Sequence, residues 1–159
     1  MAETIVAHPD QSIEQLGKSV LPPNSELMHK IVQVDFGTGG KAIVVFYRPS
    51  LTTTNYSGYV LLPEARSNQL KVTNLPPMHE ADGLFDFDIL SIFSATLSTG
   101  KRGIAVLYKY IRLGSGEDSN NAGYFYVWDA LQWSIDEHST QRLHGVDNAK
   151  TARKKLSSP

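Results

Sequence analysis

Cysteine is absent from this 159-residue sequence. Its absence excludes disulfide bonds, thiolate metal ligands and cysteine nucleophiles. An excess of charge of one sign is also lacking, because 15 Lys and Arg residues stand against 16 Asp and Glu residues, for a formal net charge of −1. This balance gives no global field that attracts nucleic acid or an anionic membrane. Apolar runs stay well short of the roughly 20 residues that a membrane-spanning helix needs, so the sequence predicts neither a nucleic-acid partner nor a membrane span.

Motifs of known enzyme classes are lacking too. The five histidines are scattered and form no His-Glu-x-x-His pair. No Gly-x-Ser-x-Gly elbow occurs, and Gly114-Ser115-Gly116 has neither the strand-to-helix context of a nucleophile elbow nor the lysine of a phosphate-binding loop. We therefore expect no catalytic residue and no cofactor, and we expect that the chain is not an enzyme.

Acidic residues are concentrated in one segment, His79 to Asp88. A histidine with several carboxylates is a candidate metal site, or a hydrolase site built on His79. However, Asp86 and Asp88 alternate with Phe85 and Phe87, which is the pattern of a strand with one solvated and one buried face. We expect that strand and no metal site.

The sequence does contain a repeat. Residues 34–48 return as residues 95–109, 61 positions later. The identical pairs are Thr38/Thr99, Gly39/Gly100, Ile43/Ile104, Val45/Val106 and Tyr47/Tyr108. Each copy of such a repeat is one supersecondary unit that buries its apolar face against its neighbours. Farther along, residues 58–63 correspond to residues 123–128 at an offset of 65, and we expect the four extra residues in the loop between them.

Strand signals follow the same order in both copies. The expected strands are residues 31–36, 42–47, 58–62 and 70–72 in the first copy, and 85–97, 104–110, 123–128 and 132–135 in the second. The sequence thus predicts an all-β fold of two pseudo-repeated four-stranded antiparallel units, similar to propeller blades. Two such units are too few to close a propeller ring. We expect a single domain over residues 1–159, with pseudo-repeats at about 21–74 and 75–136.

Short helices are expected at both ends. The first lies within residues 8–20, where Pro9 or Asp10 opens it and Gly17 stops it. The second spans about residues 147–156, is capped by Asp147, and carries Lys154 and Lys155 near its C-terminus.

The turn in each copy resembles that of FG-GAP repeats, which occur in integrin-like propellers and in small exported bacterial proteins. The turns are Asp35-Phe36-Gly37-Thr38-Gly39-Gly40 and Thr96-Leu97-Ser98-Thr99-Gly100-Lys101. In that family the turn is acidic and binds calcium. Here Asp35 is the one carboxylate left, whereas calcium takes six to eight oxygen ligands. We therefore expect neither turn to bind calcium.

Two features are candidates for contact with a partner. The first is an aromatic cluster, for which we expect core positions and, as the alternative, an exposed sheet face: Tyr108, Tyr110, Tyr124, Phe125, Tyr126, Trp128 and Trp133. The second is the polar loop 112–121. Its candidate partner-binding residues are Arg112, Gly114, Ser115, Gly116, Glu117, Asp118, Ser119 and Asn120. The interpretations of this loop are a flexible connection or a protruding segment that enters a partner's cleft.

The N-terminus Met1-Ala2-Glu3-Thr4 reads like the start left after removal of a signal peptide, so we expect a periplasmic protein. In overall character the chain is similar to periplasmic immunity proteins that bacteria keep against type VI secretion peptidoglycan amidases. That resemblance implies an inhibitor of a secreted cell-wall-degrading enzyme, with the 112–121 loop as the plug. The alternative is an FG-GAP-type module that binds a ligand or glycan.

Overall fold

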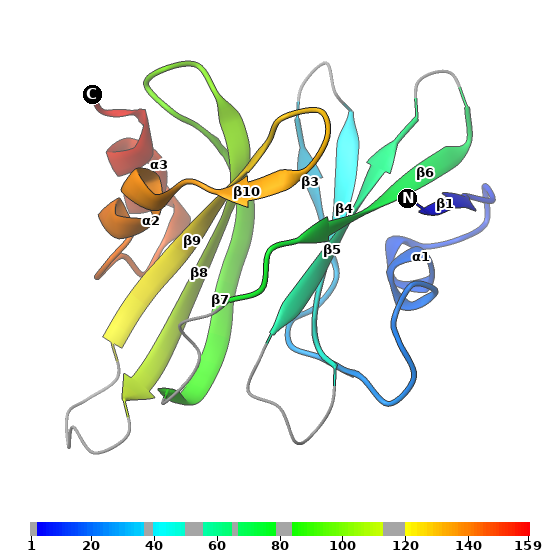
Figure 1. Ribbon diagram of the computed structural model, residues 1–159, viewed down its shortest axis with the longest axis horizontal. Helices are drawn as coiled ribbons and strands as arrows, with labels where there is room; N and C mark the ends of the chain where they lie inside the picture. Colours follow the sequence, from blue (N-terminus) through cyan, green and yellow to red (C-terminus); the bar gives the residue numbers. More distant parts are fainter. Residues whose placement is uncertain (1–2, 37–39, 50–55, 65–66, 79–83, 113–119) are drawn as a thin grey trace. The chain divides into compact units, whose positions relative to one another are not determined.

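The computed structural model describes residues 3–36, 40–49, 56–64, 67–78, 84–112 and 120–159. Within these ranges the chain is mostly β. They form two antiparallel sheets and three short helices (Figure 1). The chain divides into two units, Met1–Met78 and His79–Pro159, which we describe separately.

The first unit contains a six-stranded sheet and one helix. Its elements are β1 (Glu3–Val6), α1 (Ile13–Lys18), β2 (Glu26–Leu27), β3 (Val32–Asp35), β4 (Lys41–Arg48), β5 (Ser57–Pro63) and β6 (Gln69–Leu75). The strand order is β1-β6-β5-β4-β2, and β3 also pairs with β4. β3 to β6 follow one another along the chain, while β1 and β2 extend the edges of the sheet.

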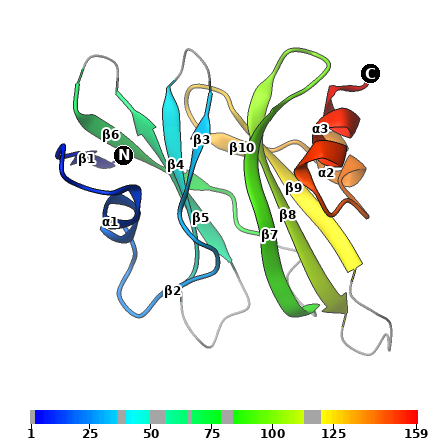
Figure 2. The same cartoon turned by 180° about the vertical axis from the view of Figure 1, so that it is seen from behind.

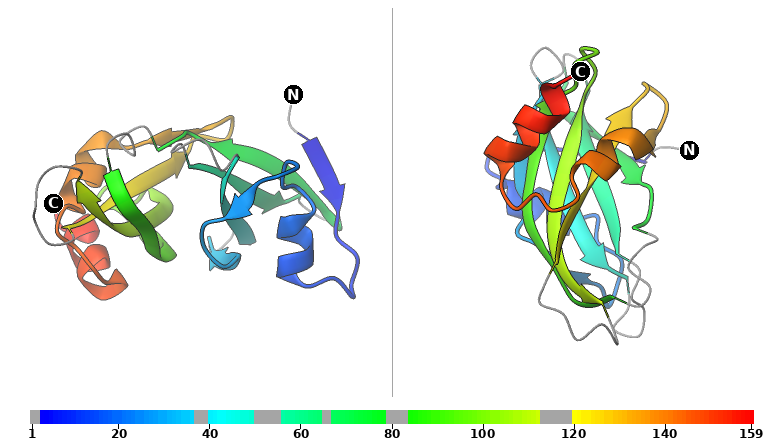
Figure 3. Two further views of the ribbon diagram at one scale, coloured as in Figure 1. Left: turned by 90° about the horizontal axis from the view of Figure 1, so that it is seen from below. Right: turned by 90° about the vertical axis from the view of Figure 1, so that its left-hand side faces the viewer.

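The second unit contains a four-stranded sheet and two helices. Its elements are β7 (Leu84–Thr96), β8 (Arg102–Arg112), β9 (Asn120–Trp128), β10 (Trp133–Ile135), α2 (Glu137–Arg142) and α3 (Ala149–Ser157). The strand order β10-β9-β8-β7 is a simple antiparallel meander (Figure 2). Both helices lie against one face of this sheet (Figure 3). Their cluster of buried residues comprises Phe93, Ala95, Ala105, Leu107, Phe125, Leu143, Val146, Ala152 and Leu156.

The central strands are apolar on both faces. In β8 and β9, Leu107 and Phe125 pack against the helices, while Ile104 and Tyr126 on the opposite face are also fully buried. In β4, residues 42–47 are buried without interruption. Burial on both faces explains why these strands read as continuous apolar runs instead of an alternation of apolar and polar residues.

The helix ends differ in detail from the sequence prediction. α1 begins after Ser12, whose hydroxyl accepts from the Gln15 backbone in a capping box, so the helix starts later than Pro9 or Asp10. Gly17 lies inside this helix and does not stop it. A Cβ at Gly17 would lie 2.7 Å from Ile31 Cδ1, so glycine permits the close approach of α1 to the sheet.

At the other end, the cap of α3 is Asn148, whose side chain accepts from the Thr151 backbone, and not Asp147 as expected. Asn148 takes this role because its carboxamide is directly before the first helical residue. α2 was not anticipated. Asp136 caps it by accepting from the Ser139 backbone.

The prediction of a mostly β chain with short helices near both ends is confirmed. The sheets are not equal four-stranded units by count, because β1 and β2 add two strands to the first. The strand pairs β4–β5 and β8–β9 nevertheless share their register. Ile43 pairs with Leu61 and Phe46 with Gly58 in the first sheet. At offsets of 61 and 65 residues, Ile104 pairs with Tyr126 and Leu107 with Gly123 in the second.

Candidate functional site

The predicted partner-binding loop joins β8 to β9. Arg112 is the last residue of β8, and its backbone pairs with Leu84 of β7. Asn120 is the first residue of β9 and pairs with Tyr110. The remaining predicted contact residues lie outside the described residues: Gly114, Ser115, Gly116, Glu117, Asp118 and Ser119. The described structure therefore supplies the two strands that carry this loop.

The four residues inserted in the second copy lengthen the hairpin ladder. In the first sheet, pairing between β4 and β5 ends at Tyr47 and Ser57. The equivalent pair in the second sheet is Tyr108 and Ala122, and two further pairs follow it, Lys109/Asn121 and Tyr110/Asn120. Beyond the last pair between described residues, nine residues join the two strands in each copy, 48–56 and 111–119. The expectation that the insertion lengthens the loop is therefore wrong; the extra residues pair across the hairpin and carry the connection farther along it.

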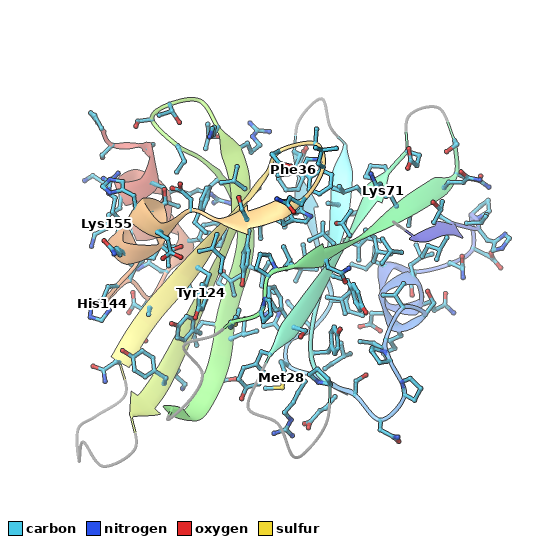
Figure 4. The ribbon with its side chains drawn as sticks, viewed as in Figure 1. Met28, Phe36, Lys71, Tyr124, His144 and Lys155 are labelled. Carbon is cyan, nitrogen blue, oxygen red and sulfur yellow. The ribbon has the colours of Figure 1, made fainter. Side chains whose placement is uncertain are left out.

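A row of four tyrosine rings runs along β8 and β9 below this connection. The ring centroids are 5.8 Å apart for Tyr110 and Tyr108, 5.6 Å for Tyr108 and Tyr124, and 6.1 Å for Tyr124 and Tyr126. Tyr124 is labelled on β9 in Figure 4. Offset contacts of this kind add to the stability gained from burial. The row packs both arms of the hairpin as far as Tyr110, the last residue of β8 that pairs with a described residue of β9.

Burial decides between the two interpretations of the aromatic cluster. Tyr110 is 7% exposed and Tyr126 is fully buried. Tyr108, Tyr124, Phe125 and Trp133 are buried as well, and Trp128 is half-buried. All of these rings except that of Trp128 are core residues, as expected, and they do not form an exposed platform. Burial also raises the pKa of Tyr126 well above its usual value, so this hydroxyl stays neutral.

The first unit has a related arrangement near the start of the 48–56 connection. Tyr47 and Tyr59 stack with centroids 5.2 Å apart and planes 14° apart. Burial raises the pKa of Tyr47, and hydrogen bonding with Tyr59 raises it further. Arg48 of β4 forms an ion pair with Glu26 of β2. The Glu26 side chain is 53% exposed, so this pair contributes about 0.5 kcal/mol and ties the short β2 to the edge of the sheet.

The described residues form neither a metal-binding cluster nor a membrane-spanning helix. Among the described residues, no group of three or more His, Asp or Glu side chains is placed to hold a metal ion. His79, Glu80 and Asp82 lie outside the described residues, and Asp88 is exposed on β7. Asp35 is exposed at the end of β3, next to a turn whose residues 37–39 are not described. The helices that the structure describes include none with the length and apolar character to cross a bilayer.

The turn between β9 and β10 is a feature that sequence reasoning missed. Trp128 and Trp133 face each other across its base with centroids 5.2 Å apart. The Asp129 carboxylate accepts hydrogen bonds from the backbone of Leu131 at 2.9 Å and of Gln132 at 2.7 Å. Ala130 has a φ of +76°, and Leu131 is 86% exposed. The segment Asp-Ala-Leu-Gln between two tryptophans is the signal that marks this turn in the sequence.

Comparisons with known proteins add no relative. No protein-family model matches the chain, and no curated protein or solved structure matches it either.

Proposed function

We propose that the chain is a binding protein that inhibits a secreted cell-wall-degrading enzyme, an immunity protein of the periplasm. In this proposal the 112–121 loop enters the active-site groove of a peptidoglycan amidase and blocks it. The observation that supports the proposal is the extended ladder of β8 and β9, which carries the 111–119 connection two residue pairs farther than its counterpart in the first sheet.

A loop that inhibits an enzyme must be held in place at both of its ends. A loop that enters a cleft loses less conformational entropy when both of its ends are already fixed. Tyr110 and Asn120 pair at the base of the connection, and the buried tyrosine row holds both arms in place. The polar loop residues would then occlude the groove, with Ser115 and Ser119 donating hydrogen bonds to the catalytic groups of the enzyme.

The test is inhibition of peptidoglycan digestion. The full chain is titrated into dye-labelled sacculi that are being digested by a panel of secreted peptidoglycan amidases, and release of dye is measured. We expect stoichiometric inhibition of at least one amidase. Deletion of residues 114–120 should abolish it. A matched control replaces Thr52, Thr53 and Thr54, in the equivalent connection of the first copy, by Ala and should leave inhibition unchanged.

Two outcomes would overturn the proposal. The first is that no amidase in the panel is inhibited by the intact chain. The second is that the chain lacking residues 114–120 inhibits as well as the intact chain, which would place the contact elsewhere. Thermal melts of both variants verify that the folded state is retained.

We further infer that the two units are copies of one four-stranded antiparallel unit of the propeller-blade kind. Its support is the common register of the repeat-bearing strands and a repeated ring pair. Tyr47 stacks on Tyr59, and Tyr108 stacks on Tyr124 at the same offsets of 61 and 65 residues. Two copies of one unit agree with the resemblance of the turns to FG-GAP repeats, although these turns lack the calcium ligands of that family.

A further inference from the structure

Exposed cations gather on α3 and on the turn that precedes β8. α3 begins with Ala149 and presents four cations to solvent, and the turn and the first residue of β8 present one each. We call the set the cationic surface: Lys101, Arg102, Lys150, Arg153, Lys154 and Lys155. In Figure 4 the labelled Lys155 lies at the outer edge of the helical layer.

The helix and the turn are neighbours in the second unit. Arg153 Nε donates to the Ser94 carbonyl oxygen at 3.3 Å, and its guanidinium lies 4.9 Å from the centroid of the Phe93 ring. Leu97, which opens the turn, packs against the buried cluster that contains Leu156. Figures 1 and 3 show the C-terminal end of α3 beside the β7–β8 turn. The six cations therefore belong to one continuous region.

Acidic partners do not neutralise this region. Among the described residues, no ion pair involves any of the six cations. The nearest acid along the chain, Asp147, accepts a hydrogen bond from the Asn148 side chain. The charge is thus available to a partner.

The helix dipole does not account for the whole set. It favours cations in the last turn, where Lys154 and Lys155 lie, and anions in the first turn. α1 and α2 follow the rule with Glu14 and Glu137 in their first turns. α3 has no acid there and carries Lys150 instead. A lysine at this end opposes the dipole, so the dipole does not explain its position.

We propose that the cationic surface docks onto a carboxylate-rich surface of the protein partner. This inference rests on the proposed function in one respect, that the partner is a protein. The cationic surface would be a second contact with that partner, formed by charged groups on elements other than the 112–121 loop. Complementary charge of this kind speeds association and orients the two proteins as they meet.

Membrane and nucleic-acid partners fit the surface less well. The apolar face of α3 is already used, because Ala152 and Leu156 are buried against the sheet of the same unit. No apolar face of this helix is left to enter a bilayer. Among the described residues no exposed aromatic ring lies between the cations, and the Phe93 ring is buried beneath Arg153. Platforms that bind single-stranded nucleic acid use such rings for stacking, so the surface lacks this feature, and duplex DNA is included in the test below.

Both guanidinium groups of the cationic surface are positioned by contacts within the second unit. Arg153 is held by Ser94 and Phe93, and Arg102 Nε donates to Thr96 Oγ1 at 3.3 Å. A guanidinium can pair with a carboxylate through two parallel hydrogen bonds, and the four lysines act as point charges.

The experiment compares three polyanions with the full chain: poly-L-glutamate, duplex DNA, and phosphatidylglycerol vesicles. Binding is measured by titration at low and at physiological salt. The test variant is K150Q/K154Q/K155Q. The matched control, K18Q/K30Q/K41Q, removes the same charge from exposed lysines of the first unit. A second variant, K101Q, probes the same surface from the β7–β8 turn.

We expect poly-L-glutamate to bind most tightly, with affinity that falls as salt rises. The test variant should bind about tenfold more weakly, K101Q should bind more weakly to a smaller extent, and the control should change less than twofold. Equal losses in test and control variants would overturn the proposal. Tighter binding of DNA or vesicles than of poly-L-glutamate would overturn it in favour of those partners.

The outcome is separable from that of the proposed function. Deletion of residues 114–120 leaves every cation of the surface in place. The deleted chain should therefore lose inhibition of amidases and keep its affinity for poly-L-glutamate. If it also loses that affinity, the cationic surface as we define it is wrong, whereas loss of inhibition alone leaves it intact.

Discussion

Gly58 lies directly opposite Phe46 between β4 and β5, so the Phe46 ring occupies the space where another residue would place its side chain. A Cβ at Gly58 would lie 3.0 Å from Phe46 Cε1 and 2.9 Å from Leu75 Cδ1. The second sheet has the same relationship. Gly123 lies opposite Leu107, and a Cβ there would lie 3.0 Å from Leu107 Cδ2. Each glycine allows a large residue of the neighbouring strand to pack over the backbone.

Substitution of these glycines by alanine should destabilise the protein unequally. We expect Gly58→Ala to lower the free energy of unfolding by about 1–2 kcal/mol, because Phe46 and Leu75 must shift. Gly123→Ala should lower it by about 3 kcal/mol, since its Cβ would lie 2.8 Å from the Val106 carbonyl oxygen, and backbone yields less readily than the end of a side chain. Urea denaturation measures both. An equal loss at the two sites would contradict this account of the packing.

Ala130 occupies a conformation that suits glycine. Its φ of +76° is disfavoured for residues with a Cβ, by about 1–2 kcal/mol. Glycine loses more entropy on folding, by about 0.5–1 kcal/mol. Ala130→Gly should therefore raise the free energy of unfolding by about 0.5–1 kcal/mol. Ala149→Gly, at the first position of α3, is the control and should have the opposite effect. Thermal melts followed by circular dichroism distinguish the two signs.

The cap of α3 can be assigned by substitution. Asn148 accepts from the Thr151 backbone at 2.8 Å, so Asn148→Ala should lower the free energy of unfolding by about 1 kcal/mol. Asp147→Ala should lower it by less than about 0.5 kcal/mol, because Asp147 is exposed and its carboxylate contacts the Asn148 side chain. A larger loss for Asp147→Ala would restore Asp147 as the cap. The comparison is made by chemical denaturation at constant pH.

Stability should fall in alkaline solution. Burial raises the pKa of Tyr47 and of Tyr126 above the ordinary value of 10.0. Below about pH 9 these tyrosines are neutral in both states, so their contribution is constant. Above about pH 10 the unfolded chain releases tyrosine protons that the folded chain retains, so the free energy of unfolding decreases as pH rises.

The variants Tyr47→Phe and Tyr126→Phe test this linkage. Each removes one hydroxyl that stays protonated in the folded state, so each should make the decrease above pH 10 shallower. Urea midpoints measured from pH 7 to pH 11 give the slope. An unchanged slope in both variants would assign the alkaline sensitivity to other groups.

The strands at the centre of each sheet were predictable from sequence. The apolar runs around Ile43 and Ile104 are long enough to indicate buried strands, and the 61-residue repeat indicates that they pair alike. Strands at the edges were not predictable. β1 and β2 are short, and each is a strand because it pairs with a strand that is distant in the sequence. Glu3 of β1 pairs with Val72 of β6, and Glu26 of β2 pairs with Arg48 of β4. Pairing with a remote partner leaves no local pattern.

The helices show the same limit. α3 has apolar residues at helical spacing, Ala152 and Leu156, and was anticipated. α2 has the sequence Glu-His-Ser-Thr-Gln-Arg, which contains no apolar residue to indicate a buried face. A residue of β9 holds this helix, because the Thr140 hydroxyl accepts a hydrogen bond from the Phe125 backbone at 3.0 Å. This contact joins residues 15 positions apart in the sequence, so the helical segment alone does not reveal it.

The sequence by itself determined the β class, the repeat and its offset, because these follow from local patterns of apolar residues and glycines. Tertiary structure decided where the extra residues of the second copy go. Lys109 and Asn121 became a ladder pair because the backbone groups of two adjacent strands satisfy one another. It also decided that Tyr108 and Tyr124 are core residues, since burial depends on what packs over a face and not on the residue type.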